Sequence, residues 1–184
     1  EPIIDSSMIP TYLITQLVKK HCSVVLGGDG GDELFGGYKH YSKLLLSQKI
    51  TGFLPMSLKK NLYFLSNLFP IGMRGKIWLQ SIKYDLRREL PLIASYFDKK
   101  EREKLIISDN WPLVSETIRE KRTFVSDDLL ERATRTDFNN YLVEDILVKT
   151  DRASMLNSLE LRAPFLSREI MEFAFTLKND YKTI

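Results

Sequence analysis

The residues with the clearest chemical potential are three acids set among glycines in the stretch from Val24 to Tyr38. Six of the nine glycines of the chain lie here, interleaved with Asp29, Asp32 and Glu33. A glycine loop before a helix brings bare backbone close to a ligand and directs N–H groups at an anion such as phosphate. Carboxylates repel phosphate unless a hard cation such as Mg²⁺ lies between them. The stretch therefore predicts a site for nucleotide phosphate with Mg²⁺.

The elements that must position these acids are a strand and a helix. The short, β-branched run at 23–26 predicts a buried strand, and Leu34, Tyr38, Tyr41 and Leu45 recur at helical spacing. We expect the loop to end near Asp32 and the following helix to include Gly36 and Gly37. Each glycine inside a helix costs about 1 kcal/mol relative to alanine, so a close neighbour is expected there.

Other glycine motifs fit this stretch less well. A Walker A loop needs a Gly-Lys-Ser/Thr triplet, which the sequence lacks, and a dinucleotide GxGxxG beginning at Gly28 would need glycine at position 33, where Glu33 stands. The calcium-binding G-G-x-G-x-D unit occurs once, from Gly27 to Asp32, whereas a β-roll needs tandem copies. A tight turn without a ligand would explain the glycines but not the acids.

Composition limits the remaining possibilities. A chain of 184 residues with 43% hydrophobic residues can bury one core, which makes a single domain the default. The 27 basic and 24 acidic residues give a formal charge of +3, so neither nucleic acid nor an anionic membrane is an expected partner. Cys22 is the only cysteine, and no apolar run is long enough to span a bilayer. We expect a cytoplasmic protein.

Capping residues and apolar periodicity predict a mainly helical chain. A helix is expected from Pro10 to about Lys20, and short helices near 56–68, 73–83, 86–96, 98–107 and 111–121. Ser126-Asp127-Asp128 should cap a helix through 129–135, and Thr136-Asp137 should begin the next. Ser167 is an expected N-cap for a last helix whose inward residues would be Ile170, Phe173, Ala174 and Leu177.

Charged residues follow one face of the helix that includes positions 138–152. Asp145, Lys149 and Arg152 are spaced i, i+4 and i+7, which fits either an exposed ladder of ion pairs or the polar wall of an active site. Further along, charges alternate with apolar residues, and we expect them to form buried ion pairs that orient this helix against the glycine loop. These charges are Asp151, Arg152, Glu160 and Arg162.

Two blocks of sequence resemble one known family. The block 26–38 is similar to the LSGDGGDELFGGY signature of glutamine-dependent asparagine synthetases, with Gly27 where the family usually has serine. The block 147–155, LVKTDRASM, and the following SLELRAPFL at 158–166 resemble the K-x-D-R-x-S-M and L-E-x-R-x-P-F-L-D motifs of the same family. The family usually has aspartate where Ser167 stands. Between 47 and 126 the resemblance extends only to a helical region of variable sequence.

The resemblance implies a fold and a set of roles. The fold would be a predominantly α-helical fragment of an α/β adenine-nucleotide α-hydrolase-like (PP-loop ATP pyrophosphatase) domain, with one short parallel-type strand near 23–26. Family members join the carboxylate of aspartate to AMP from ATP, and ammonia released from glutamine then forms the amide. By resemblance, Leu26, Gly27, Gly28 and Gly30 would bind ATP. Asp29 and Asp145 would be catalytic, and Asp32 and Glu33 would hold Mg²⁺.

The resemblance also implies parts that residues 1–184 lack. These are the pyrophosphate-binding S-G-G-x-D-S loop, a downstream lysine and the glutaminase domain. We therefore expect residues 1–184 to be a partial synthetase domain, inactive alone, that self-associates through its strand edge and uncovered apolar surface. Two alternatives stay open: a relative that acts on another carboxylate, such as a sugar acid, peptide or β-lactam precursor, or a helical interaction domain without catalysis.

Overall fold

The computed structural model describes residues 5–70, 73–86, 118 and 121–182, and the chain divides into two compact units. The first, the glycine-loop unit, comprises residues 1–37 and 134–183, and the second, the helical unit, comprises residues 38–133 with residue 184. The two segments of the glycine-loop unit are far apart in sequence. The glycine loop and the 147–166 block belong to the same unit. The two blocks of sequence that resemble the family motifs can therefore contribute to one site.

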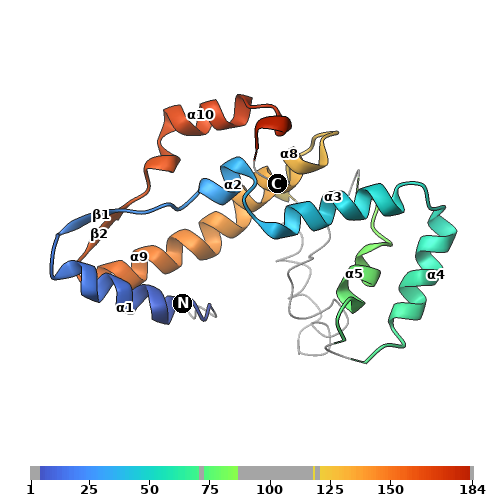
Figure 1. Cartoon of the computed structure of the whole chain (residues 1–184), viewed down its shortest axis with the longest axis horizontal. Helices are drawn as coiled ribbons and strands as arrows, with labels where there is room; N and C mark the ends of the chain where they lie inside the picture. Colours follow the sequence, from blue (N-terminus) through green and yellow to red (C-terminus); the bar gives the residue numbers. More distant parts are fainter. Residues whose placement is uncertain (1–4, 71–72, 87–117, 119–120, 183–184) are drawn as a thin grey trace. The chain divides into compact units, whose positions relative to one another are not determined.

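A two-stranded parallel sheet joins the two segments of the glycine-loop unit. Strand β1 (Val24–Leu26) pairs with β2 (Glu160–Arg162) in the register Val24 to Glu160 and Leu26 to Arg162, and the strands lie side by side in Figure 1. The strand expected near 23–26 is confirmed, but it is not buried as expected, since Val24 and Leu26 keep 42% and 69% of their surface exposed. Strand β2 was not expected, because three residues that alternate charged and apolar are too few to show a strand pattern. The chain is thus mostly helical with a short parallel sheet.

Helix α1 (Met8–Lys19) packs against α9 (Leu147–Met155). Asn157 holds the two together, since its side-chain amide donates to the Tyr12 carbonyl at 3.0 Å and to the Thr15 hydroxyl at 2.9 Å. The Lys19 ammonium donates to the Ser158 carbonyl at 2.6 Å. These bonds fix α1 along the helix that carries Lys149.

The apolar stripe of α1 is left uncovered. Four of its residues keep between 55% and 69% of their surface exposed: Ile9, Leu13, Ile14 and Leu17. Such a surface is consistent with the expected self-association, which stays a prediction.

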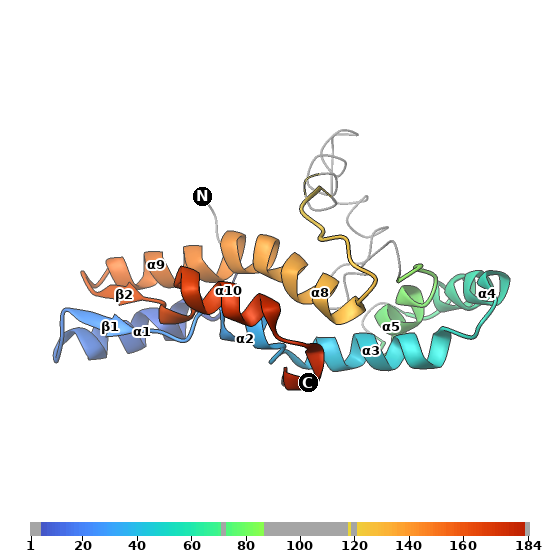
Figure 2. The same cartoon turned by 90° about the horizontal axis from the view of Figure 1, so that it is seen from above.

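The helix that carries Asp145 is part of a longer helical run. Helix α8 (Leu129–Asp137), the π-helix η1 (Phe138–Ile146) and α9 follow one another without a break in sequence, as Figure 2 shows. The expected cap is confirmed, because the Asp128 carboxylate accepts from the Glu131 amide at 2.9 Å. The expected helix start at Thr136-Asp137 is wrong: Thr136 lies inside the run, with 2% of its surface exposed.

The chain beyond β2 forms three short elements, η2 (Pro164–Leu166), α10 (Arg168–Thr176) and η3 (Asn179–Tyr181). The Ser167 cap is confirmed, since its hydroxyl accepts from the Ile170 amide at 3.4 Å. Ala174 is fully buried, as expected, but Phe173 is 60% exposed and does not point inward. No helix among the described residues is both long and apolar enough to cross a membrane.

The helical unit contains α3 (Lys39–Thr51), α4 (Met56–Ser66) and α5 (Lys76–Ser81). Its buried core is formed by Tyr41, Leu44, Leu129, Leu130 and Ala133. Helices α4 and α5 confirm the helices expected near 56–68 and 73–83. Those expected at 86–96, 98–107 and 111–121 lie almost entirely outside the described residues.

Candidate active site

The glycine loop follows the carboxyl end of β1 and leads into the short helix α2 (Gly31–Phe35). Its first residue is still held by the sheet, because the Gly27 amide donates to the Arg162 carbonyl at 2.8 Å. Gly30 adopts φ 88°, and the Leu166 side chain occupies the space that a Cβ would need there. Glycine is therefore required at position 30 both for its backbone angle and for packing.

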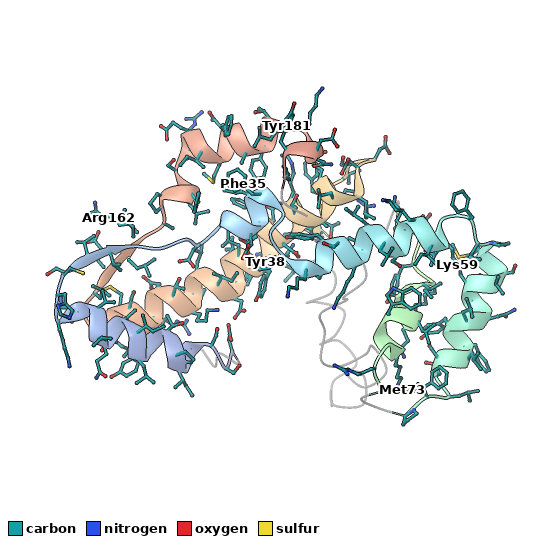
Figure 3. All side chains as sticks on the ribbon, viewed as in Figure 1. Phe35, Tyr38, Lys59, Met73, Arg162 and Tyr181 are labelled. Atoms are coloured by element: carbon teal, nitrogen blue, oxygen red, sulfur yellow. The ribbon has the colours of Figure 1, made fainter. Side chains whose placement is uncertain are left out.

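The two sequence blocks meet at this loop. Phe165 of η2 lies 3.6 Å from the position of a Cβ on Gly31. Its ring also meets Phe35, labelled in Figure 3, edge to face with centroids 6.0 Å apart. The segments that follow the carboxyl ends of β1 and β2 thus pack on each other, which is the usual place for a ligand site beside a parallel sheet.

Gly36 and Gly37 have a different role from the one expected. Helix α2 ends at Gly36, which caps it with φ 74°, so neither glycine lies inside a helix. The Asp32 carboxylate occupies the space beside Gly37 where a Cβ would lie. The close neighbour predicted for this pair is therefore the Asp32 side chain itself.

The three acids of the loop occupy different environments. Asp29 is half-buried, Asp32 is exposed, and Glu33 retains 1% of its surface exposed. Within the described part of the chain no group of three or more potential ligands is placed to hold a metal ion. Mg²⁺ commonly takes one or two protein carboxylates and completes its shell with phosphate oxygens and water. The exposed carboxylate of Asp32 fits that arrangement, whereas Glu33 faces the interior.

Asp29 carries a buried oxygen, Oδ2, that has no hydrogen-bond partner among the described residues. Burial raises the pKa of Asp29 above its usual range, while the Thr150 hydroxyl and the positive charge of Lys149 oppose that rise. Buried carboxylate oxygens normally find a donor, so an unpartnered one beside a glycine loop is a feature of functional sites.

Residues of η1 and α9 form the facing wall. Burial, followed by the charge of Asp5, raises the pKa of Asp145, and Lys149 opposes this. Burial and the charge of Asp145 raise the pKa of Tyr141, which also feels Glu33. Asp145 is thus partly buried and lies within electrostatic reach of Asp5 and Lys149. Tyr141 and Asp145 both lie in a nine-residue π-helix. π-Helices are rare, and π-helical turns often occur at functional sites.

The ion pair of the wall includes a residue that sequence reasoning missed. The Lys149 ammonium lies 2.7 Å from Asp5 Oδ2, and the two side chains retain 12% and 18% of their surface. The other oxygen of Asp5 accepts from the Ser7 amide and hydroxyl, both at 2.8 Å. The Asp-Ser-Ser sequence before α1 signals a turn at a helix start, but nothing in it signals Lys149 as a partner.

The expected buried ion pairs beside the sheet are wrong. Arg162 and Glu160 pair on the same strand at 2.8 Å, with 65% and 54% of their side chains exposed. Arg162 projects outward from β2 in Figure 3. Asp151 is also exposed, and Arg152 is only partly buried. In a three-residue strand, residues at positions 160 and 162 share one face, and here that face is open.

Comparison with known proteins shows the family of the chain. The family model for asparagine synthase matches residues 1–184, and the chain belongs to that family. It is 34% identical over 187 residues to glutamine-hydrolyzing asparagine synthetase 1 of Bacillus subtilis (strain 168), covering 100% of this chain and 29% of the relative.

Two further relatives are putative glutamine-hydrolyzing asparagine synthetases. That of Mycobacterium bovis is 34% identical, with 96% of this chain and 27% of the relative covered. Putative glutamine-hydrolyzing asparagine synthetase 2 of Methanocaldococcus jannaschii is 32% identical, with 90% of this chain and 32% of the relative covered. The chain thus spans about a third or less of these relatives' length. No solved structure matches it.

Proposed function

We propose that residues 1–184 form part of the synthetase domain of an ATP-dependent asparagine synthetase. The observation that carries this proposal is that Asp29, in the loop after the carboxyl end of β1, lies within reach of Thr150 and Lys149 of α9. In the proposed reaction an oxygen of the aspartate side chain attacks the α-phosphorus of ATP. The bond from that phosphorus to the oxygen bridging to the β-phosphate breaks, and its electron pair leaves with pyrophosphate. Ammonia from glutamine then displaces AMP and yields asparagine.

The residues of this chain would act mainly by position and charge. Leu26, Gly27, Gly28 and Gly30 would present backbone groups to ATP, since the loop there has no bulky side chain. Asp29 and Asp145 would flank the reacting carboxylate and ammonia. Asp32 is the exposed acid that fits Mg²⁺ on the departing pyrophosphate, and that ion would neutralise the developing charge. We place Glu33 behind Asp32 as a supporting acid, because its side chain is buried.

The test uses the full-length protein, with Asp32→Asn and a control, Asp180→Asn, in which the changed acid lies on η3 outside the site. Aspartate-dependent exchange of labelled pyrophosphate into ATP should require Mg²⁺ and should fall at least tenfold in Asp32→Asn alone. Exchange that depends on another carboxylate would reassign the acceptor. Absence of any exchange in the unmodified protein would refute the proposal. Residues 1–184 produced alone should release no pyrophosphate from ATP.

A further inference from the structure

The ion pair between Asp5 and Lys149 joins the turn before α1 to the wall of the proposed site. Only one oxygen of Asp5 is used for Lys149, at 2.7 Å, and the other is held by Ser7. Ser7 therefore holds one oxygen of the acid, while the other oxygen pairs with the lysine. Lys149, in turn, has only 12% of its side chain exposed, so its ammonium has little freedom to choose another position.

Lys149 faces acids from several elements. The Lys149 hydrogen bond and charge hold the pKa of Asp5 at about 2, against the effect of burial. Burial tends to lower the pKa of Lys149, but the Asp5 hydrogen bond and the charges of Asp5 and Asp145 raise it. Lys149 also acts on Asp29 of the glycine loop and on Tyr141 of η1. The Lys149 ammonium thus pairs with the turn before α1 and lies within electrostatic reach of the loop and the π-helix.

We propose that Lys149, anchored by Asp5, is a positioning residue of the adenylation site. Its fixed positive charge holds the carboxylates of Asp29 and Asp145 in the geometry that the reacting carboxylate and ATP require. This inference rests on the proposed function and goes beyond it, because Lys149 would act through its neighbours rather than on the reacting atoms. Asp5 serves to keep the ammonium in place.

The bonding pattern separates this role from a purely structural one. In Asp5→Asn the remaining carbonyl oxygen can still accept from Ser7, so the turn before α1 is kept while the anionic partner of Lys149 is lost. In Lys149→Met the cation itself is lost and the length of the side chain is roughly kept. If the pair only fastened α1 to α9, the two changes would have equal effects.

The test compares full-length variants by pyrophosphate exchange and by thermal unfolding. Lys149→Met should lower the kcat of exchange about 10- to 100-fold, with a smaller change in the KM for ATP, because misplaced groups reduce reaction rates more than binding. Asp5→Asn should lower kcat less, and Lys149→Arg should recover most of it. Lys19→Met is the matched control, since it removes another lysine bond between α1 and the turn after α9, away from Asp29.

The outcomes are distinguishable. An unmodified protein without exchange activity would defeat the proposed function itself. If that protein is active and Lys149→Met retains its kcat, the positioning role is wrong. Equal losses of kcat in Lys149→Met and Asp5→Asn, in parallel with equal losses of Tm, would show a structural fastening and also overturn it.

Discussion

The unpartnered oxygen of Asp29 leads to a sharp prediction at position 27. An ideal Cβ on Gly27 lies 3.4 Å from Asp29 Oδ2 and 2.9 Å from Leu161 Cδ2. A serine there places its hydroxyl within reach of that oxygen, while the end of the flexible Leu161 side chain shifts by a few tenths of an ångström. Gly27→Ser introduces the residue that is usual in the family signature, and it should supply a donor to Oδ2, which has none among the described residues.

The magnitude follows from the burial of Asp29. A hydrogen bond to a charged group contributes about 1.5–3 kcal/mol, and the low end, reduced to about 1 kcal/mol, suits a half-buried carboxylate. Such a bond stabilises the ionised carboxylate and so lowers the pKa of Asp29. Burial now raises the pKa of Asp29 above 3.8, so the folded protein holds this proton more tightly than the unfolded chain does. Stability therefore falls as pH rises from 3.8 through the folded pKa, and serine should restore part of the loss above that range.

The control is Gly27→Ala, which adds the same Cβ without the hydroxyl. Urea unfolding of the full-length protein should give Gly27→Ser about 1 kcal/mol more stability than Gly27→Ala near pH 7, and almost no difference near pH 3. Carboxyl-carbon NMR should show the lower Asp29 pKa in the serine variant alone. Equal pKa values in the two variants would refute the reasoning that Oδ2 lacks only a donor.

Three other predictions concern the loop and the helix it faces. Gly28 has open space around its missing Cβ, so Gly28→Ala should leave Tm unchanged. If ATP approaches the protein backbone at this position, the added methyl group should weaken ATP binding about tenfold in calorimetric titrations. Unchanged affinity would count against that contact. Gly37→Ala should displace the Asp32 carboxylate and raise the Mg²⁺ concentration needed for pyrophosphate exchange, and an unaltered Mg²⁺ requirement would contradict it. Asn157→Ala should destabilise the protein by about 1–3 kcal/mol in urea unfolding, because it removes two hydrogen bonds, to the Tyr12 carbonyl and to the Thr15 hydroxyl; a loss below about 0.5 kcal/mol would show that α1 is held by packing instead.

The sequence revealed the local elements around the loop better than the contacts between segments. The strand at 23–26, the cap at Ser126 to Asp128 and the Ser167 cap all follow from short-range patterns and are confirmed. Gly36 was wrongly placed inside a helix, because the apolar residues around it keep helical spacing. Only its φ of 74° shows that it caps α2.

Long-range partners had no local signal. Asp5 meets Lys149 across 144 positions of sequence, and no spacing rule connects them. Strand β2 forms because residues 160–162 pair with β1, a tertiary contact that overrides the weak pattern of three residues. The exposed pair of Arg162 and Glu160 follows from the same strand geometry, whereas the sequence analysis expected these residues to form buried ion pairs.

The parallel pairing of β1 with β2 has a consequence for how this architecture can diversify. Both strands, the glycine loop, η2 and helices α1 and α9 belong to one unit, while residues 38–133 form another. The intervening segment can therefore lengthen, shorten or change its sequence between relatives as long as its two ends return to the same strand register. Variation would accumulate in the insert while the chemistry stays with the pair of strands.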